Sequence, residues 1–109
     1  VEVVPDGGFY DYTARYTAGA TEFFAPARLD PAAMRACESV AVEVHRSLGL
    51  RDWSRSDLIL DAAGTPWFLE VNVAPGMTET STFPQATAAD GQRLGALTRT
   101  LIAKAQARQ

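Results

Sequence analysis

Apolar and polar side chains alternate in two neighbouring segments near the middle of the chain, residues 55–61 and 68–72. This alternation is typical of half-buried β-strands, and Gly64 and Pro66 between the segments indicate a turn. We therefore expect an antiparallel hairpin whose turn centres near Ala63 and Gly64. The expected opposing pairs are Arg55–Asn72, Asp57–Glu70, Leu60–Trp67 and Asp61–Pro66.

One face of this hairpin is expected to be polar and the other apolar, because alternate residues of a strand share a face. The polar face would carry Arg55, Asp57, Glu70 and Asn72. The apolar face would carry Leu58, Leu60, Trp67, Leu69, Val71 and Val73. Opposed Cβ atoms lie about 5 Å apart, so two carboxylates and an amide oxygen could share one divalent cation.

The polar residues of the hairpin predict a particular metal chemistry. Two carboxylates this close repel each other unless a cation lies between them. Oxygen ligands suit magnesium, manganese or calcium, and the lack of nearby His or Cys argues against zinc. So few protein ligands are typical of a magnesium site that water and phosphate oxygens complete. Arg55 would then hold a phosphate oxygen. The alternative is an ordinary solvated sheet face.

A polar loop follows the second strand at residues 73–82. Pro75 and Gly76 end the strand and expose backbone N–H groups. Beside a metal, such a loop can bind an anion or stabilise an oxyanion. Further hydroxyl donors come from Thr78, Thr80, Ser81 and Thr82. We interpret the loop as a substrate loop, although a turn of this kind can also bind nothing.

The rest of the chain predicts strands, a flexible loop and two helices. Residues 1–4 and 9–12 are expected to form a hairpin, and residues 22–26 another strand after a lid-like loop at 17–21. One helix would begin at Pro31, capped by Asp30, and end at Gly49. Asp90 would open a second helix with Leu94, Leu97, Leu101 and Ile102 inward. The expected fold class is α+β, mainly antiparallel sheet with two packed helices.

Composition narrows the function classes. With 109 residues, the chain fits one domain. A net charge of −3 shows no basic bias that would favour a nucleic acid partner, and no apolar run is long enough to cross a membrane. A lone cysteine, Cys37, suits a reducing cytoplasm. Cys37 and His45 lie on the expected first helix without catalytic partners and are interpreted as packing or boundary residues.

Several of these residues together resemble a known family. Arg55-Ser-Asp57, then Glu70-Val-Asn72-Val-Ala-Pro75-Gly76-Met77-Thr78 with Ser81 beyond, closely resembles the carboxy-terminal part of D-alanine–D-alanine ligases, which are ATP-grasp enzymes of peptidoglycan precursor synthesis. The opening Phe9-Tyr10-Asp11-Tyr12-Thr13-Ala14-Arg15-Tyr16 is similar to the stretch that leads into the family's active-site loop. The resemblance covers nearly the whole chain.

The resemblance implies a role for each site residue. Asp57, Glu70 and Asn72 would hold two magnesium ions, with manganese as a substitute, and these would bridge the phosphates of ATP. Arg55 would contact the transferred phosphoryl group. The backbone N–H of Gly76 would stabilise the tetrahedral intermediate. Ser81 would bind the carboxylate of the second D-alanine.

A tyrosine and its neighbour belong to the expected mobile loop. The resemblance implies that Tyr16 lies on the loop that closes the site and favours an amino acid over a hydroxy acid as second substrate. Family members usually carry lysine before this tyrosine, and this chain carries Arg15. Arginine keeps the charge but not the shape of lysine, so a phosphate contact from Arg15 is less secure.

The resemblance also implies that residues 1–109 are the carboxy-terminal part of a longer ligase. The family's amino-terminal and central lobes, with the phosphate-binding lysines and the adenine pocket, have no counterpart here. We expect the parent to ligate two D-alanines as a cytoplasmic homodimer and this part alone to be inactive. The alternatives are a related ligase of the D-alanine–D-serine type, or a degenerate ATP-grasp domain without catalysis.

Overall fold

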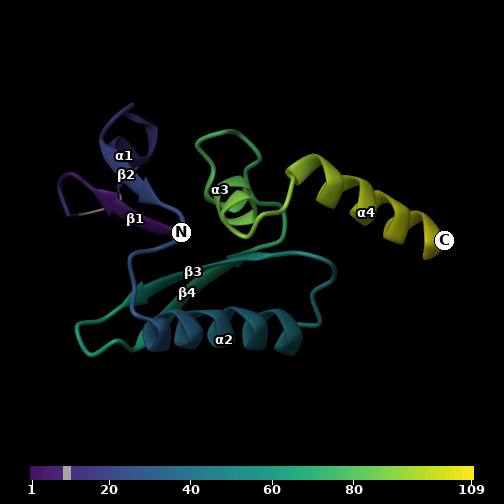
Figure 1. Ribbon diagram of the computed structural model, residues 1–109, viewed down its shortest axis with the longest axis horizontal. Helices are drawn as coiled ribbons and strands as arrows, with labels where there is room; N and C mark the ends of the chain where they lie inside the picture. Colours follow the sequence, from purple (N-terminus) through teal and green to yellow (C-terminus); the bar gives the residue numbers. More distant parts are fainter. Residues whose placement is uncertain (9–10) are drawn as a thin grey trace.

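The computed structural model describes residues 1–8 and 11–109, and of Arg15 and Tyr16 it describes the backbone alone. Its elements follow one another as β1 (Glu2–Pro5), α1 (Tyr12–Tyr16), β2 (Thr21–Phe24), α2 (Pro31–Ser47), β3 (Arg55–Leu60), β4 (Pro66–Asn72), α3 (Thr82–Ala89) and α4 (Leu94–Ala107) (Figure 1). The strands form two separate antiparallel pairs, β1–β2 and β3–β4. The α+β class is therefore confirmed, while the expected sheet consists of two small ones.

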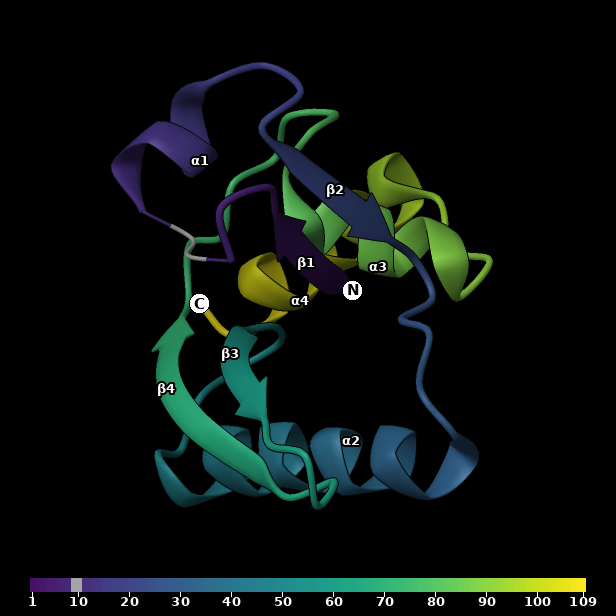
Figure 2. The ribbon, with the colours of Figure 1, turned by 90° about the vertical axis from the view of Figure 1, so that its left-hand side faces the viewer.

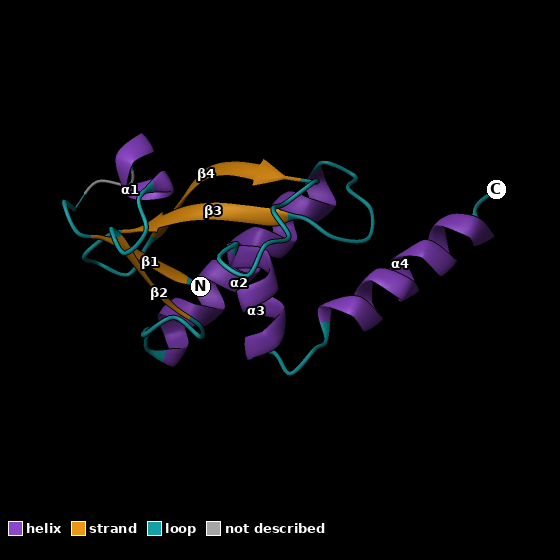
Figure 3. Ribbon diagram, turned by 90° about the horizontal axis from the view of Figure 1, so that it is seen from above, coloured by secondary structure: helices purple, strands orange, loops and turns teal. Residues whose placement is uncertain are grey.

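The hairpin β3–β4 lies between two groups of elements. Helix α2 runs along one face of the hairpin, whereas β1–β2, α3 and α4 lie on the other side (Figures 1 and 2). Seen from above, α4 extends away from α3 toward one end of the molecule (Figure 3). The hairpin therefore has one face covered by α2 and one face turned toward the loops that carry the candidate substrate contacts.

The register of the hairpin confirms the pairs at its open end and corrects those near its turn. Arg55 lies opposite Asn72 and Asp57 opposite Glu70, as predicted. The register then shifts by one residue, so that Leu60 lies opposite Pro66 rather than Trp67. The extra residue on β4 is Leu69, which gives the hairpin a β-bulge.

The bulge also corrects the predicted composition of the two faces. Ile59 pairs with Trp67, and Ile59 is two residues from Asp57, so both side chains share the carboxylate face. Both are largely exposed, Ile59 at 56% and Trp67 at 60%. On the opposite face the hydroxyl oxygen of Ser56 is enclosed, without a hydrogen-bond partner among the described residues. Trp67 was thus wrongly placed on the apolar face.

The turn of the hairpin is organised by one aspartate. Asp61 accepts hydrogen bonds at 2.9 Å from the backbone N–H groups of Ala63 and Thr65 and from Nε1 of Trp67. The bond from Trp67, with help from Thr65, holds the pKa of Asp61 below its ordinary value. Through these three hydrogen bonds Asp61 acts as a turn residue of the hairpin.

The amino-terminal strands pair differently from the prediction. The expected hairpin between residues 1–4 and 9–12 is wrong at Tyr12, which begins α1, while Phe9 and Tyr10 lie outside the described residues. Strand β1 pairs instead with β2, with Glu2 opposite Phe24. A strand near residues 22–26 was predicted, but its partner was not.

Arg28 fastens this small sheet. Its guanidinium donates to both carboxylate oxygens of Glu2, at 3.0 and 2.9 Å, and its Cζ lies 3.5 Å from the centroid of the Phe24 ring. The side-chain hydrogen bonds from Arg28, followed by the backbone N–H of Arg28, lower the pKa of Glu2 from 4.5 to about 2. The carboxylate is therefore favoured in its charged form when the sheet is folded.

The Glu2–Arg28 pair predicts an acid-sensitive sheet. Because the folded state lowers this pKa, the stabilisation is complete above pH 4.5 and is lost as the pH falls toward about 2. We expect the protection of the amides in β1 and β2, measured as the ratio of the intrinsic to the observed exchange rate at each pH, to fall across this window. The Glu2→Gln variant should lack that pH dependence. The exposed Glu43→Gln variant should keep it. An unchanged pH profile in Glu2→Gln would contradict this role.

The helices show one confirmed and one corrected prediction. Helix α2 begins at Pro31, and the side chain of Asp30 accepts from the N–H groups of Ala32 and Ala33, as expected. Asp90, however, follows the last residue of α3, whereas α4 begins at Leu94 after Arg93. Helix α3 was not predicted, since its short run of small residues has no clear apolar stripe.

Apolar side chains in the described part of the chain are mostly half-buried or exposed. Among the described residues, Ala14 and Ala33 are buried, at 9% and 7% exposure, as is Pro75. None of the helices in this part combines the length and apolar character that crossing a bilayer requires. Because few apolar side chains in the described part of the chain are buried, the hairpin is held by its contacts with α2 and by its own pairing rather than by a deep core.

Candidate functional site

The open end of the hairpin gathers a guanidinium and two carboxylates on one face. Arg55 donates to Asp57 through Nε at 2.7 Å and Nη2 at 2.9 Å, and Nη2 lies 3.7 Å from Oε1 of Glu70. The Glu70 side chain is 65% exposed and that of Arg55 only 20%. Arg55 thus offsets the charge of the two carboxylates and leaves Glu70 open to a ligand.

Asn72 ends β4 beside this cluster. It lies opposite Arg55, and its Oδ1 accepts a hydrogen bond at 2.9 Å from the backbone N–H of Ala74. This local bond turns the chain out of the strand and fixes the direction of the amide oxygen. A carbonyl-type oxygen has two lone pairs, so Asn72 can accept one further ligand.

The oxygens of this cluster fit magnesium chemically. Asp57, Glu70 and Asn72 supply two carboxylates and an amide oxygen, the hard donors that magnesium prefers. Each carboxylate has about four lone-pair sites, so the bonds from Arg55 leave room on Asp57. Within residues 1–8 and 11–109 no three His, Cys, Asp or Glu side chains gather as a metal site. A cation here therefore needs the amide oxygen and outside ligands.

The loop after β4 folds back on itself around Ser81. Ser81 Oγ accepts from the backbone N–H of Thr78 at 3.1 Å and lies 2.8 Å from the Thr78 hydroxyl. A Cβ built on Gly76 would lie 2.7 Å from this same oxygen. Pro75 is buried, while residues 76–80 are exposed. The absence of a side chain at Gly76 therefore lets Ser81 approach the loop backbone.

Ser81 also stands at the beginning of α3. It is the N-cap residue, yet its side chain makes no capping bond within the helix, and the first turn carries no acidic residue. The first N–H groups of a helix lack internal partners and carry partial positive charge. Together with the hydroxyl of Ser81, they can receive a carboxylate or phosphate.

The predicted lid residues are described only in part. Tyr16 is the last residue of α1, and the side chains of Tyr16 and Arg15 lie outside the described residues. Thr21 Oγ1 donates to the carbonyl oxygen of Ala14 at 2.7 Å and so ties α1 to β2. The roles given to Tyr16 and Arg15 remain predictions.

An aromatic pair near the site was missed in the sequence. Trp53 meets Phe83 of α3 edge to face, with ring centroids 5.1 Å apart. The signal available was that Trp53 precedes Arg55 by two residues and Phe83 follows Ser81 by two. Because α3 was not among the predicted elements, these sequence distances did not indicate a contact between the two rings.

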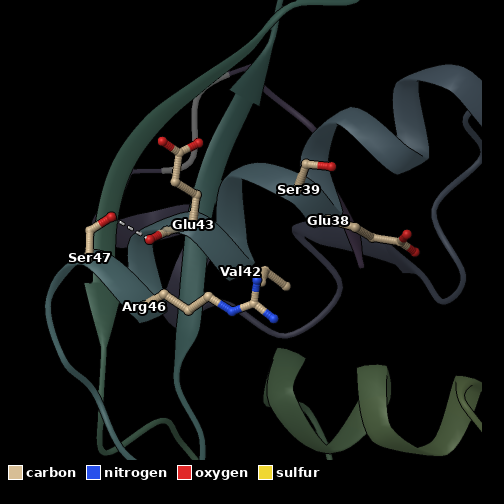
Figure 4. Close-up of a pocket in the computed structure, with 6 residues that line it drawn as sticks. All are labelled: Glu38, Ser39, Val42, Glu43, Arg46 and Ser47. Carbon is tan, nitrogen blue, oxygen red and sulfur yellow. Dashed lines mark hydrogen bonds between the residues drawn. The ribbon is translucent and has the colours of Figure 1, made fainter.

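A surface hollow lies away from the predicted site. It has a volume of about 440 Å³, and the residues that line it all come from α2 (Figure 4): Glu38, Ser39, Val42, Glu43, Arg46 and Ser47. Its one drawn hydrogen bond joins the Ser47 hydroxyl to the Glu43 carbonyl oxygen, which belongs to the helix itself. The hollow is therefore a helix face and contains none of the predicted site residues.

Two kinds of comparison with known proteins, one with a family model and one with individual proteins, give matching results. A family model described as "D-ala D-ala ligase C-terminus" matches residues 1–103. A protein named D-alanine–D-alanine ligase from Anaeromyxobacter dehalogenans (strain 2CP-C) is 48% identical over 84% of this chain and 30% of its own length. One of the same name from Burkholderia thailandensis is 47% identical over 84% of this chain and 29% of its own length. The matched part of the chain thus spans less than a third of the length of these relatives.

Proposed function

This chain belongs to the D-alanine–D-alanine ligase family, and we propose that the protein containing it joins two D-alanines with ATP, for peptidoglycan precursor synthesis. The observation that carries the proposal is the cluster of Arg55, Asp57 and Glu70 directly before the loop from Gly76 to Ser81. The two steps of the proposed reaction, phosphoryl transfer and attack by the amine, require the cluster and the loop to be neighbours. The proposal includes an ATP-grasp fold, a homodimer and a cytoplasmic location.

Magnesium and ATP are the proposed cofactors of the hairpin. Asp57, Glu70 and Asn72 would hold two magnesium ions, or manganese in their place. Bound there, the ions would neutralise the phosphate charge of ATP. The exposure of Glu70 and the hard-oxygen chemistry of the three donors support this assignment.

Arg55 is proposed to contact the phosphoryl group during its transfer. The γ-phosphoryl group would pass from ATP to a carboxylate oxygen of the first D-alanine, which gives ADP and an acyl phosphate. A guanidinium has five N–H donors, and Arg55 makes two hydrogen bonds to Asp57. Further donors therefore remain for phosphate oxygens, while Asp57 holds the guanidinium in position.

The loop after β4 is proposed to serve the second half of the reaction. The amine of the second D-alanine would attack the carbonyl carbon of the acyl phosphate, and the tetrahedral intermediate would expel phosphate. The amine would lose one proton to solvent on the way to the amide. The backbone N–H of Gly76, with Arg55, would stabilise the oxyanion of that intermediate. Tyr16 would close the site over both substrates.

Ser81 is proposed to bind the carboxylate of the second D-alanine at the start of α3. Hydrogen bonds to charged groups contribute about 1.5–3 kcal/mol. Ser81→Ala should therefore raise the KM for D-alanine by about 10- to 100-fold. Steady-state kinetics against D-alanine would measure this. Ser39→Ala, the same change on the outer face of α2, should leave it unaltered. An unchanged D-alanine requirement in Ser81→Ala would remove the serine from the site.

The proposed reaction is tested in the intact protein by phosphate release from magnesium-ATP. D-alanine, D-serine and D-lactate would be offered separately as second substrates. Release that requires D-alanine supports the proposal. Release with D-serine instead keeps the chemistry and identifies the related D-alanine–D-serine type. No release with any of them favours a degenerate ATP-grasp domain.

A further inference from the structure

The contact between Trp53 and Phe83 joins the two parts of the proposed site, which are the hairpin with Arg55 and the start of α3 with Ser81. Trp53 lies two residues before β3, which begins at Arg55, and Phe83 lies in the first turn of α3, two residues after Ser81. Their rings meet edge to face, with a centroid separation of 5.1 Å and an interplanar angle of 71°. Both residues are half-buried. This arrangement is a favoured aromatic geometry.

The loop between β4 and α3 is poorly suited to fix the position of Ser81 relative to Arg55. Residues 76–80 are exposed, and the hydrogen bonds of Ser81 Oγ run to Thr78 within the same loop. They shape the loop but do not tie α3 to the hairpin. Exposed backbone with few external contacts opens readily. A contact outside the loop is therefore needed to hold Ser81 relative to Arg55.

We propose that Trp53 and Phe83 are positioning residues that fix Ser81 relative to Arg55, and so place the carboxylate of the amine substrate relative to the acyl phosphate. This inference rests on the proposed function. An aromatic edge-to-face pair resists sliding more than a purely aliphatic contact, because its geometry is specific. Neither residue touches substrate in this assignment.

The first test is kinetic and uses the intact protein. Phe83→Ala should raise the KM for D-alanine by about tenfold, since small displacements of a binding group have large effects, while the KM for ATP stays within about twofold. Phe83→Tyr, which keeps the ring, should restore the KM for D-alanine. A merely structural role would lower the active fraction, and hence the rate, without this selective change.

An ion pair at the residue before Trp53 supplies the control. Arg108, beyond the end of α4, donates to Asp52 at 2.9 and 3.2 Å. Arg108→Gln removes a tie to the residue beside Trp53 but leaves the aromatic pair. It should therefore leave the KM for D-alanine unchanged. Equal KM increases in Arg108→Gln and Phe83→Ala would overturn the proposal, because any disturbance of this segment would then suffice.

Hydrogen exchange separates this inference from the proposed reaction. Phe83→Ala should accelerate exchange at the amides of residues 81–83 and 85, and Phe83→Tyr should not. If the unaltered protein shows no ligation, the proposed function fails, and exchange alone decides whether the pair orders the start of α3. Unchanged exchange in Phe83→Ala, or an unchanged KM for D-alanine in an active enzyme, overturns the positioning role.

Discussion

Replacement of Glu70 with glutamine is expected to remove nearly all D-alanine-dependent phosphate release. The change deletes the most exposed carboxylate of the hairpin cluster and keeps its size. Metal ions stabilise transition-state charge by several kcal/mol, and each 1.36 kcal/mol is tenfold in rate, so the loss should be about 10²- to 10³-fold. Phosphate release from magnesium-ATP would measure it.

The fold should survive this substitution. Arg55 keeps both of its hydrogen bonds to Asp57, and its contact with Glu70 is the longer one, at 3.7 Å. Thermal unfolding of Glu70→Gln should therefore match that of the unaltered protein. Glu38→Gln, the same change on the exposed face of α2 (Figure 4), should affect neither property. Near-normal turnover in Glu70→Gln would exclude the hairpin as the metal site.

Replacement of Gly76 with alanine is expected to have the second large effect, by a steric route. The new Cβ would lie 2.7 Å from Ser81 Oγ and 3.3 Å from Ser81 Cβ. Contacts under 3 Å force a shift, and Ser81 is already fixed by Thr78. A displacement of about 1 Å in a positioned group can cost about 10²-fold in rate. We expect this loss in kcat/KM for D-alanine.

Gly7→Ala is the matched control for the Gly76 variant. Neither glycine has a positive φ, and a Cβ at Gly7 meets nothing within 4 Å. Any general effect of a glycine-to-alanine change on the unfolded chain is therefore shared, while the clash with Ser81 is specific to Gly76. If Gly76→Ala retains full activity with D-alanine, Ser81 does not need its present place.

Local sequence rules sufficed for the elements whose partners lie close in the chain. Helix α2 was predictable, because Asp30 and Pro31 are strong signals for a helix start. The pairing of Asp57 with Glu70 followed from alternation and from a short turn. Strands β3 and β4 carry Arg55, Asp57, Glu70 and Asn72, so the polar residues at the open end of the hairpin were predictable from the sequence.

The remaining features depend on contacts that no local pattern contains. Strand β1 pairs with β2 across α1, and this choice is fixed by contacts such as Glu2 with Arg28. The short helix α3 is placed by the ring of Phe83 against Trp53. The proximity of Gly76 to Ser81 required three-dimensional coordinates as well. Sequence resemblance named Gly76 and Ser81, but it did not explain why a side chain at Gly76 would be harmful.

The bulge at Leu69 divides the hairpin into two parts that pair in different registers. On its open side, the pairs Arg55–Asn72 and Asp57–Glu70 keep a regular register. On the turn side, the pairs are offset by one residue. Because the extra residue absorbs that offset, the opposition of the two carboxylates does not depend on which residues pair near the turn.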